Sequence, residues 1–248
     1  MSKLQFDSGQ FRKFFRLLQL GDKEAVIELR ALSFKGRRSN TFSGYFDDED
    51  AFVKAAEEAA KNSAGVYCTI NRLNPQLLCR SANRAEPFAQ LSTSDADISR
   101  RRYLPIDLDA IRPSGTSSSE EQHQAAIQKS REIFKFIRDK GFPEPIVIDS
   151  GNGAHQLMPF DEPNDQNSKT LAQNILKKLA DQFNDEWVKV DESVFNAGRI
   201  MRLPGSMNRK GDHLPKYPHR LCRIMSIPEP LKSYAEAPLF QRRQHESS

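Results

Sequence analysis

The sequence predicts a protein of the mixed α/β or α+β class, and two features of the chain support this. Short apolar runs rich in β-branched and aromatic residues alternate with longer segments whose apolar residues recur at helical spacing. One pair of strand-like runs is joined by a tight turn at Gly151 and Gly153, which favours a mixed sheet over a purely doubly wound one. With 248 residues, of which 38% are hydrophobic, the chain can bury a sizeable core.

The first hundred residues predict two helices and two strands. Phe11, Phe14 and Phe15 recur at the spacing of an amphipathic helix, with basic residues between them. Asp47 or Asp48 is placed to cap the second helix, which is rich in Ala and Glu. We expect helices over residues 10–20 and 48–61, strands over 25–32 and 65–71, a polar loop over 33–44, and a surface segment of little periodicity over 72–99.

The rest of the chain predicts two long helices and a series of strands. Ser118 and Glu121 have the spacing of a capping box at the start of the first helix, and Gly141 and Pro143 end it. We expect helices from 118 to about 140 and over 168–183, and strands over 104–109, 145–149, 154–160, 187–190, 199–203 and 221–227.

The composition argues against membrane-bound and disulfide-bonded proteins. The chain has no run of roughly 18 apolar residues, and its start, MSKLQFDSGQ, lacks the apolar segment of a secretory signal. The three cysteines, Cys68, Cys79 and Cys222, are odd in number and lack the spacing of a metal clasp. We therefore expect a cytoplasmic protein with reduced thiols, no membrane partner and no zinc.

Two aspartates, Asp107 and Asp109, lie two residues apart in a strand-like run. Residues two apart on a strand share a face, so both carboxylates project together while Ile106, Leu108 and Ala110 point into the core. Like charges repel, and a hard divalent cation such as Mg²⁺ or Mn²⁺ would relieve the repulsion. The alternative is a strand end at which one aspartate is solvated and the other caps a turn. The pair alone leaves both interpretations open.

The segment DSGNGAHQLMPF, residues 149–160, is a candidate phosphate site. Gly151 and Gly153 allow a tight turn whose N–H groups, together with the Ser150 hydroxyl and His155 on the returning strand, could bind phosphate oxygens. The alternative is an ordinary glycine hairpin with a half-buried histidine.

A third carboxylate and a basic segment follow later in the chain. Asp191 ends a short apolar run and would complete a site for two metal ions. Arg202, Asn208 and Lys210 flank a Pro-Gly turn and could meet the phosphates that such metals bind, although a solvated basic face has the same composition. Further basic groups that could follow a nucleic-acid backbone are residues 100–102, the run 209–223, and Arg12, Lys13 and Arg16.

Taken in order, these motifs resemble the archaeo-eukaryotic primase superfamily. The motifs are Asp-x-Asp at a strand end, Ser-Gly-x-Gly-x-His, and an isolated Asp followed by Arg-x-Pro-Gly-x-x-Asn-x-Lys. The chain is most similar to the primase-polymerase branch of plasmids, phages and bacterial operons, because GYFDDEDAF and GVYCTINRLNP resemble its amino-terminal segment. The resemblance covers roughly the first 225 residues, although Gln156 and Leu157 stand where the family often has an aromatic residue.

The resemblance implies one catalytic domain over residues 1–230 and a role for each motif. An amino-terminal α/β module would occupy about 1–100 and an RRM-like catalytic sheet about 101–230, followed by a polar tail, 231–248, that could lead to further domains. The implied metal ligands for Mg²⁺ or Mn²⁺ are Asp107, Asp109 and Asp191; the implied nucleotide-binding residues are Ser150, Gly151, Gly153, His155, Arg202, Asn208 and Lys210.

The implied activity is that of a DNA primase and polymerase. Such an enzyme would join NTPs or dNTPs on a single-stranded DNA template and primer, with other replication, repair or defence proteins as partners. Tyr67 and Tyr103 are candidates for screening the sugar 2′ position. The alternatives are a non-catalytic nucleic-acid-binding module, which three aspartates disfavour, and a metal-dependent nuclease, which the lack of a Glu-x-Lys beside the acids disfavours.

Overall fold

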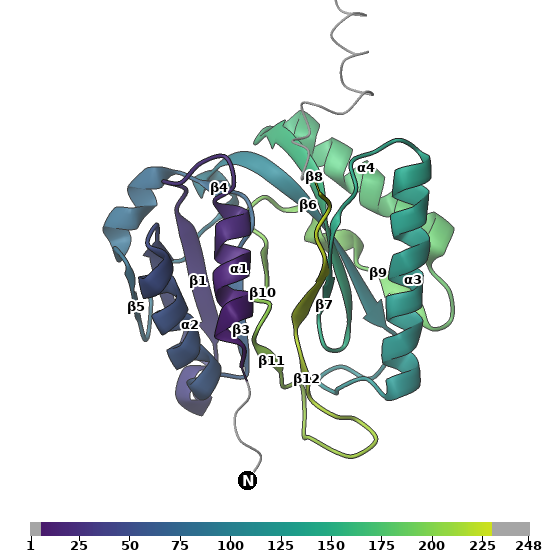
Figure 1. Ribbon diagram of the computed structural model, residues 1–248, viewed down its shortest axis with the longest axis horizontal. Helices are drawn as coiled ribbons and strands as arrows, with labels where there is room; N and C mark the ends of the chain where they lie inside the picture. The colour runs from purple at the N-terminus through teal and green to yellow at the C-terminus, as the bar shows by residue number, and fades with distance from the viewer. Residues whose placement is uncertain (1–5, 230–248) are drawn as a thin grey trace, which may run out of the picture.

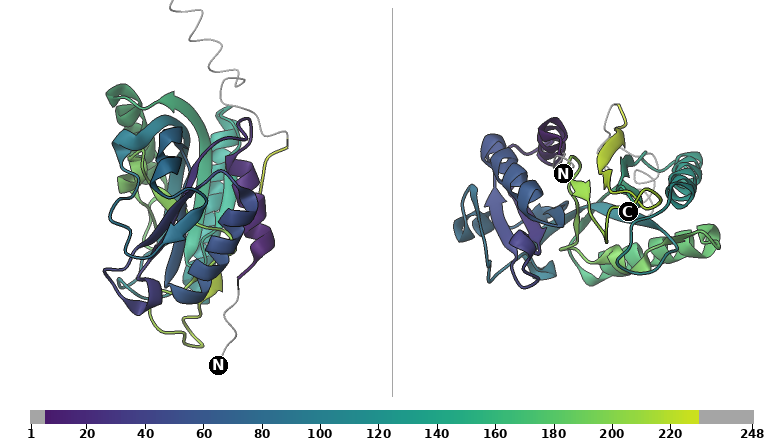
Figure 2. Two further views of the ribbon diagram at one scale, coloured as in Figure 1. Left: turned by 90° about the vertical axis from the view of Figure 1, so that its left-hand side faces the viewer. Right: turned by 90° about the horizontal axis from the view of Figure 1, so that it is seen from below.

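The computed structural model describes residues 6–229, which form two antiparallel sheets lying side by side (Figure 1). Helices α1 and α2 lie beside the first sheet at one end of the molecule, and α3 and α4 lie beside the second sheet at the other end (Figure 2, right). The mixture of helices and antiparallel strands confirms the predicted fold class.

The first sheet has the strand order β10-β3-β1-β2-β5. Its strands are β1 (Ile27–Leu32), β2 (Phe42–Phe46), β3 (Gly65–Thr69), β5 (Arg84–Glu86) and β10 (Ile200–Arg202). Helices α1 (Ser8–Leu18) and α2 (Glu49–Asn62) pack on it, and their first turns are capped by Asp7 and Asp48, whose side chains accept backbone N–H groups. The caps explain why both helices begin close to their predicted positions.

The second sheet has the order β13-β7-β8-β6-β4, and β9 pairs with the end of β6. Its strands are β4 (Arg72–Leu73), β6 (Ile98–Ala110), β7 (Ile146–Asp149), β8 (Gly153–Pro163), β9 (Val188–Val190) and β13 (Arg223–Ser226). Helices α3 (Glu120–Asp139) and α4 (Gln166–Phe183) cover one face. A separate ribbon of β11 (Met207–Asn208) and β12 (Arg220–Leu221) completes the strands of the described chain.

Apolar packing joins the two sheets. The largest core cluster combines the phenylalanines of α1, among them Phe11 and Phe14, with Ile146, Ile148 and Leu157 of the second sheet. A second cluster fills the space between β6, β8, α3 and α4. One face of the second sheet is therefore buried against helices, while the other faces the amino-terminal module.

Two strands cross the predicted division near residue 100. β4 lies before this boundary but joins the second sheet, and β10 lies after it but pairs with β3 in the first sheet. The two modules are thus linked by exchanged strands, and the predicted boundaries stay a prediction. The polar tail, 231–248, lies outside the described residues.

Several local predictions need correction. Residues 42–44, expected at the end of a loop, belong to β2, because pairing with β1 and β5 stabilises a strand that the glycine at 44 obscures. The capping box of α3 is formed by Ser119 and Gln122, since Ser118 is buried and bonded to Asn152. The segment 72–99 contributes buried Leu73, Leu77 and Ile98, besides the short 3₁₀ helices η2 (Pro75–Arg80) and η3 (Asp95–Asp97).

Two further observations concern membrane-spanning helices and the cysteines. Within residues 6–229, no helix has both the length and the hydropathy needed to cross a membrane. Cys68, Cys79 and Cys222 are all free thiols.

Candidate active site

The paired aspartates lie on the face of β6 that the helices leave uncovered. Ile106 and Leu108 alternate with them and are fully buried against α3 and α4. The predicted orientation of Asp107 and Asp109 away from the core is thereby confirmed.

The strands on either side of β6 bring further polar residues to the same level. His155 on β8 lies opposite Asp107, with 3.3 Å between its Nε2 and Asp107 Oδ1. On the other side, the N–H of Asp191 donates to the carbonyl oxygen of Asp107 at 2.9 Å, directly after β9. Asp109, one step further along β6, has Gly153 and Lys189 as its neighbours on β8 and β9. Residues distant in sequence thus meet on three paired strands.

The turn between β7 and β8 requires its glycines for steric reasons. Gly151 has a φ of +86°, a left-handed conformation that side chains disfavour. A Cβ at Gly153 would lie 2.0 Å from the carbonyl oxygen of Leu108, so only glycine lets β8 pair with β6 at Asp109. The N–H of Gly151 donates to Asp149 and that of Gly153 to Ser150 Oγ. The predicted role of these two N–H groups as phosphate donors is therefore not supported, because both are used within the turn.

A buried hydrogen bond between a histidine and an aspartate supports this turn. His123 of α3 and Asp149 of β7 are both almost fully buried, and their Nε2 and Oδ1 atoms are 2.8 Å apart. The same carboxylate oxygen accepts the N–H of Gly151, and Arg223 lies 3.5 Å from the other oxygen. Burial alone would raise the pKa of Asp149, but the bonds from His123 and Gly151 and the charge of Arg223 outweigh it and lower the pKa. Sequence reasoning missed both His123 and Asp149, whose pairing no sequence pattern reveals.

The opposite wall of the site comes from β3, β10 and β11. Arg202 of β10 is buried beside Tyr67 of β3, its guanidinium 4.9 Å from the ring centre and donating to Tyr67 Oη at 2.9 Å. Asn208 Nδ2 donates to the carbonyl oxygen of Ser150 at 2.8 Å, which ties β11 to the glycine turn. Arg202 lies beside Tyr67 because β10 pairs with β3 in the first sheet.

A cavity of about 280 Å³ lies between these walls. Sequence reasoning identified most of its polar lining, including Tyr67 as a candidate for screening the nucleotide sugar, and the structure adds Arg199, to which sequence reasoning assigned no single role. The polar residues that line it are Tyr67, Asp107, Asp109, Ser150, His155, Arg199, Arg202, Asn208 and Lys210. Among the predicted site residues, Gly151, Gly153 and Asp191 do not line it.

Three of these side chains have buried polar atoms without a partner. His155 Nδ1, Asn208 Oδ1 and Arg199 Nε make no hydrogen bond within the described residues. His155 and Asn208 are 7% and 3% exposed. Because an unsatisfied buried polar atom is costly, the cavity is suited to a polar ligand that bonds to such atoms.

The charges of the cavity act on Asp107. Burial would raise the pKa of this carboxyl group, but the neighbouring His155, Lys210 and Arg199 outweigh the effect and lower the pKa below its ordinary value. Asp107 is therefore ionised at neutral pH and available as an anionic ligand.

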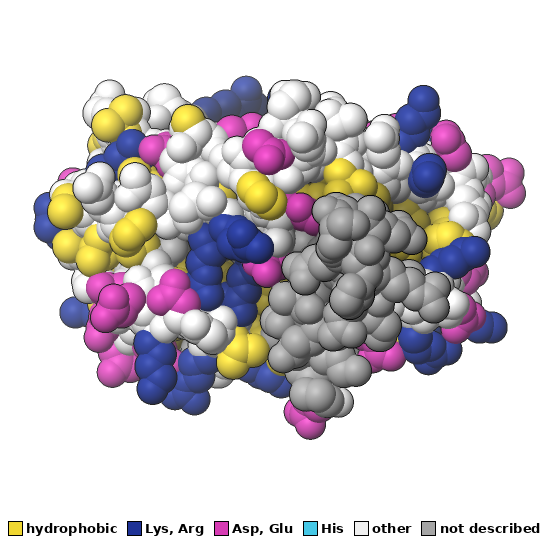
Figure 3. Space-filling view, turned by 90° about the horizontal axis from the view of Figure 1, so that it is seen from above, with side chains coloured by type: hydrophobic (Ala, Val, Ile, Leu, Met, Phe, Trp, Pro, Cys, Tyr) yellow, Lys and Arg dark blue, Asp and Glu magenta, His cyan; other side chains and the backbone are white. Residues whose placement is uncertain are grey.

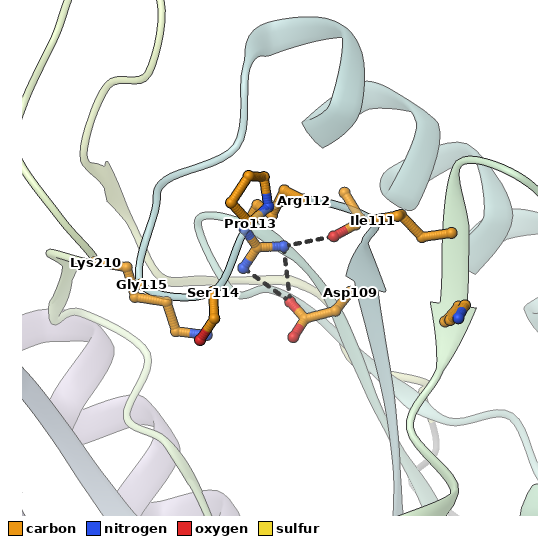
Figure 4. A pocket seen from close by; sticks show the side chains of 9 residues that line it. Asp109, Ile111, Arg112, Pro113, Ser114, Gly115 and Lys210 are labelled. Atoms are coloured by element: carbon orange, nitrogen blue, oxygen red, sulfur yellow. Dashed lines mark hydrogen bonds and ion pairs between the residues drawn. The ribbon is translucent and has the colours of Figure 1, made fainter.

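The three predicted metal ligands are close along the backbone but do not face one point. Within residues 6–229, no three His, Cys, Asp or Glu side chains are grouped to hold a metal ion. Asp109 Oδ1 accepts from Arg112 at 3.2 Å, as Figure 4 shows, and Asp191 caps the 3₁₀ helix η4 (Glu192–Phe195) through the N–H of Ser193. An all-carboxylate donor set suits Mg²⁺ or Mn²⁺. Asp109 and Asp191 would have to leave their present partners to share such an ion with Asp107.

Most of the basic groups predicted to follow a nucleic-acid backbone are engaged within the protein. In the triplet 100–102, Arg100 pairs with Asp161, Arg101 is buried, and Arg102 donates to the carbonyl oxygens of Leu18 and Leu20. In α1, Arg12 and Arg16 both pair with Glu49. The run 209–223 is also largely engaged: Arg209 bonds Ala60 and Ser63, Arg220 pairs with Glu120, and Arg223 faces Asp149. On the face shown in Figure 3, basic and acidic side chains are interspersed.

The two tyrosines predicted as candidates for screening the sugar lie in different places, and the role of Tyr67 stays a prediction. Tyr103 is buried in the core and far from solvent, whereas Tyr67 lines the cavity. Tyr103 is thus excluded as a screen for the nucleotide sugar, and Tyr67 is kept.

No protein-family model matches this sequence, and no curated protein sequence matches it. The fold does match a solved structure, the AEP domain of the primase-polymerase of cyanophage S-2L. The TM-score is 0.53 at 14% identity, over 94% of this chain and 96% of that one. The chain has the fold of an archaeo-eukaryotic primase-polymerase domain.

Other solved primase and polymerase domains score lower. The catalytic domain of the primase RepB′ in complex with initiator DNA has a TM-score of 0.48 at 11% identity, covering 96% of this chain and 95% of that one. The polymerase domain of Mycobacterium tuberculosis ligase D in complex with DNA has a TM-score of 0.45 at 16% identity, covering 87% and 81%. The fold assignment depends on the cyanophage domain, and at these identities likeness establishes the fold rather than the activity.

Proposed function

We propose that this protein is a primase-polymerase, a nucleotidyltransferase that makes and extends primers on single-stranded DNA from NTPs or dNTPs. The observation that carries the proposal is the cavity beside β6. Two carboxylates there, Asp107 and Asp109, share the lining with His155, Arg202 and Lys210. This combination suits a metal-bound polyphosphate, because the anionic side would hold cations and the cationic side phosphate oxygens.

Asp107, Asp109 and Asp191 would hold Mg²⁺ or Mn²⁺. Bound there, the ions would activate the attacking 3′-hydroxyl and neutralise the charge that builds on the α-phosphate. Asp107 is already ionised and placed between His155 and Asp191. Asp109 would exchange Arg112 for the ion, which makes the Arg112 pair a competing interaction in the absence of substrate.

The remaining lining residues would bind the nucleotide. Ser150 and His155 lie on the side of the glycine turn, where the Ser hydroxyl can donate to a phosphate oxygen. Lys210 supplies a positive charge without a side-chain partner among the described residues. Arg202 is held against Tyr67 and Asn208 against Ser150, so both are fixed before a ligand arrives.

The test is a primer-synthesis and primer-extension assay on single-stranded DNA, with NTPs, dNTPs and mixtures in Mg²⁺ or Mn²⁺. We expect template-directed incorporation that chelation by EDTA abolishes. The substitution Asp107→Asn should lower incorporation by about a hundred-fold or more, because electrostatic stabilisation is commonly the largest part of such catalysis. Near-normal incorporation by Asp107→Asn would overturn the assignment. DNA digestion with Mg²⁺ in the absence of nucleotides would favour a nuclease, and binding without incorporation a non-catalytic module.

A further inference from the structure

A second cavity, of about 340 Å³, adjoins the candidate active site at the end of β6. The two cavities share Asp109 and Lys210. Figure 4 shows the loop of residues 111–115, with Arg112 paired to Asp109 and Lys210 lying next to Ser114 and Gly115. Apart from Arg112, which pairs with Asp109, its other lining residues have no part in the roles proposed above for nucleotide or metal.

Its charge favours an anionic ligand. Arg112, Lys189 and Lys210 line it together with one carboxylate, Asp109. Arg112 is occupied by Asp109 and by the carbonyl oxygens of Ala110 and Thr116, which hold the loop in place. The ammonium groups of Lys189 and Lys210 have no partner within the described residues, so they are available to a phosphate.

An exposed aromatic residue is joined through its backbone to a residue that lines this cavity. Trp187, the only tryptophan of the chain, is 50% exposed. Its carbonyl oxygen accepts the N–H of Ile111 at 2.8 Å, which extends the β6 to β9 pairing by one residue. Ile111 lines the cavity and is itself 41% exposed. The indole N–H of Trp187 donates to Glu186 Oε1 at 3.2 Å, and Lys189 follows two residues later. Proteins commonly bind single strands by stacking a base on an exposed aromatic ring while a nearby positive charge contacts a backbone phosphate.

We propose that Trp187, Ile111 and the cavity at Lys189 form a binding site for a single-stranded polynucleotide, with a base on Trp187 and a backbone phosphate at Lys189. The site would lead a strand towards Asp109 from the side opposite Ser150 and His155. This inference rests on the proposed function for its biological meaning, but it concerns residues that the proposed chemistry does not use. It also replaces the paired arginines of 100–102 and α1 as the route of the strand.

The test uses the full chain without metal or nucleotide, so that it reports on strand binding alone. A thymidine oligonucleotide of roughly a dozen residues is titrated while tryptophan fluorescence is recorded, and its affinity is measured separately by anisotropy of a labelled copy. We expect quenching that follows the binding curve. Trp187→Ala should weaken binding about ten-fold, and Trp187→Phe should restore most of it, because stacking needs a ring.

The charge contribution is tested with Lys189→Gln. This variant should bind more weakly and lower the salt dependence of log Kd by about 0.7, the value for one phosphate contact on a single strand. Lys177→Gln, at an exposed position of α4, is the matched control and should behave as the unaltered protein.

Three outcomes would overturn the proposal. They are an oligonucleotide that binds without quenching, no binding at all, or equal quenching by dTTP alone, which would assign the site to a free nucleotide triphosphate. Incorporation with no quenching would refute this site and leave the proposed function intact. Quenching with no incorporation in any nucleotide mixture would refute the function and leave the site intact.

Discussion

The buried carboxylate behind the glycine turn makes a quantitative prediction about stability. Asp149 is 3% exposed, and its Oδ1 takes two hydrogen bonds, one from His123 and one from the N–H of Gly151. The substitution Asp149→Asn keeps the shape but removes the charge. A hydrogen bond to a charged group contributes about 1.5–3 kcal/mol, so we expect a loss of about 2 kcal/mol of unfolding free energy. For a chain of this length, that lowers Tm by roughly 4–8 °C.

The dependence of this effect on pH follows from the lowered pKa of Asp149. A carboxyl group whose pKa is lower in the folded state contributes stability above its unfolded pKa, and the contribution is lost as the pH falls through the folded value. The difference between the unaltered protein and Asp149→Asn should therefore be complete above about pH 4, the unfolded value, and shrink below it.

The assay is urea unfolding at a series of pH values. Asp139→Asn is the control, because Asp139 lies on the surface with its partner Arg138 3.6 Å away, and it should change stability by no more than about 0.5 kcal/mol. An Asp149→Asn protein as stable as the control at pH 7 would refute the stabilising role of the contact between His123 and Asp149. A stability difference that does not change down to the acid transition would refute the pKa argument.

Two further substitutions test the sheets that position the site. Gly153→Ala would place a Cβ 2.0 Å from the carbonyl oxygen of Leu108, so β8 must separate from β6. We expect urea unfolding to show a loss of about 3 kcal/mol of unfolding free energy, and a protein of normal stability would contradict the required close approach. Glu28→Gln removes the charge of the fully buried partner of Arg30 in β1 and should also lower the unfolding free energy by about 3 kcal/mol. The control is Glu86→Gln, which alters the exposed pair of Arg84 and Glu86 and should change the unfolding free energy by about 0.5 kcal/mol or less. Equal effects of the two glutamate substitutions would show that burial does not govern the pair.

Local patterns predicted those elements that short-range interactions determine. The amphipathic spacing of Phe11, Phe14 and Phe15 predicted α1, and Asp48, the N-cap of α2, predicted where α2 begins. The alternation around Asp107 and Asp109 placed both carboxylates on one face of a strand, as found. In these cases the residues that determine the structure lie within a few positions of one another.

The predictions were wrong where contacts with a segment distant in sequence determine the local structure. β2 exists because β1 and β5 pair with it, and the capping box moved to Ser119 because Asn152 binds Ser118. The arginines of α1 and of residues 100–102 looked available for nucleic acid, yet folding gives most of them an internal partner. A basic residue pattern records charge but not whether an acidic or carbonyl partner lies nearby in space.

The sequence by itself therefore determined the class of the fold, most of the helices and strands, and the chemical types that line the candidate site. Only the tertiary structure decided which of them meet. It brought Tyr67 to Arg202 through β10 and set His123 against Asp149. It also turned Asp109 toward Arg112 and joined Trp187 to Ile111, which lines a second cavity. The physical reason is that strand pairing and burial join residues more than a hundred positions apart, such as Tyr67 and Arg202, which are 135 positions apart, and such contacts leave no local trace in the chain.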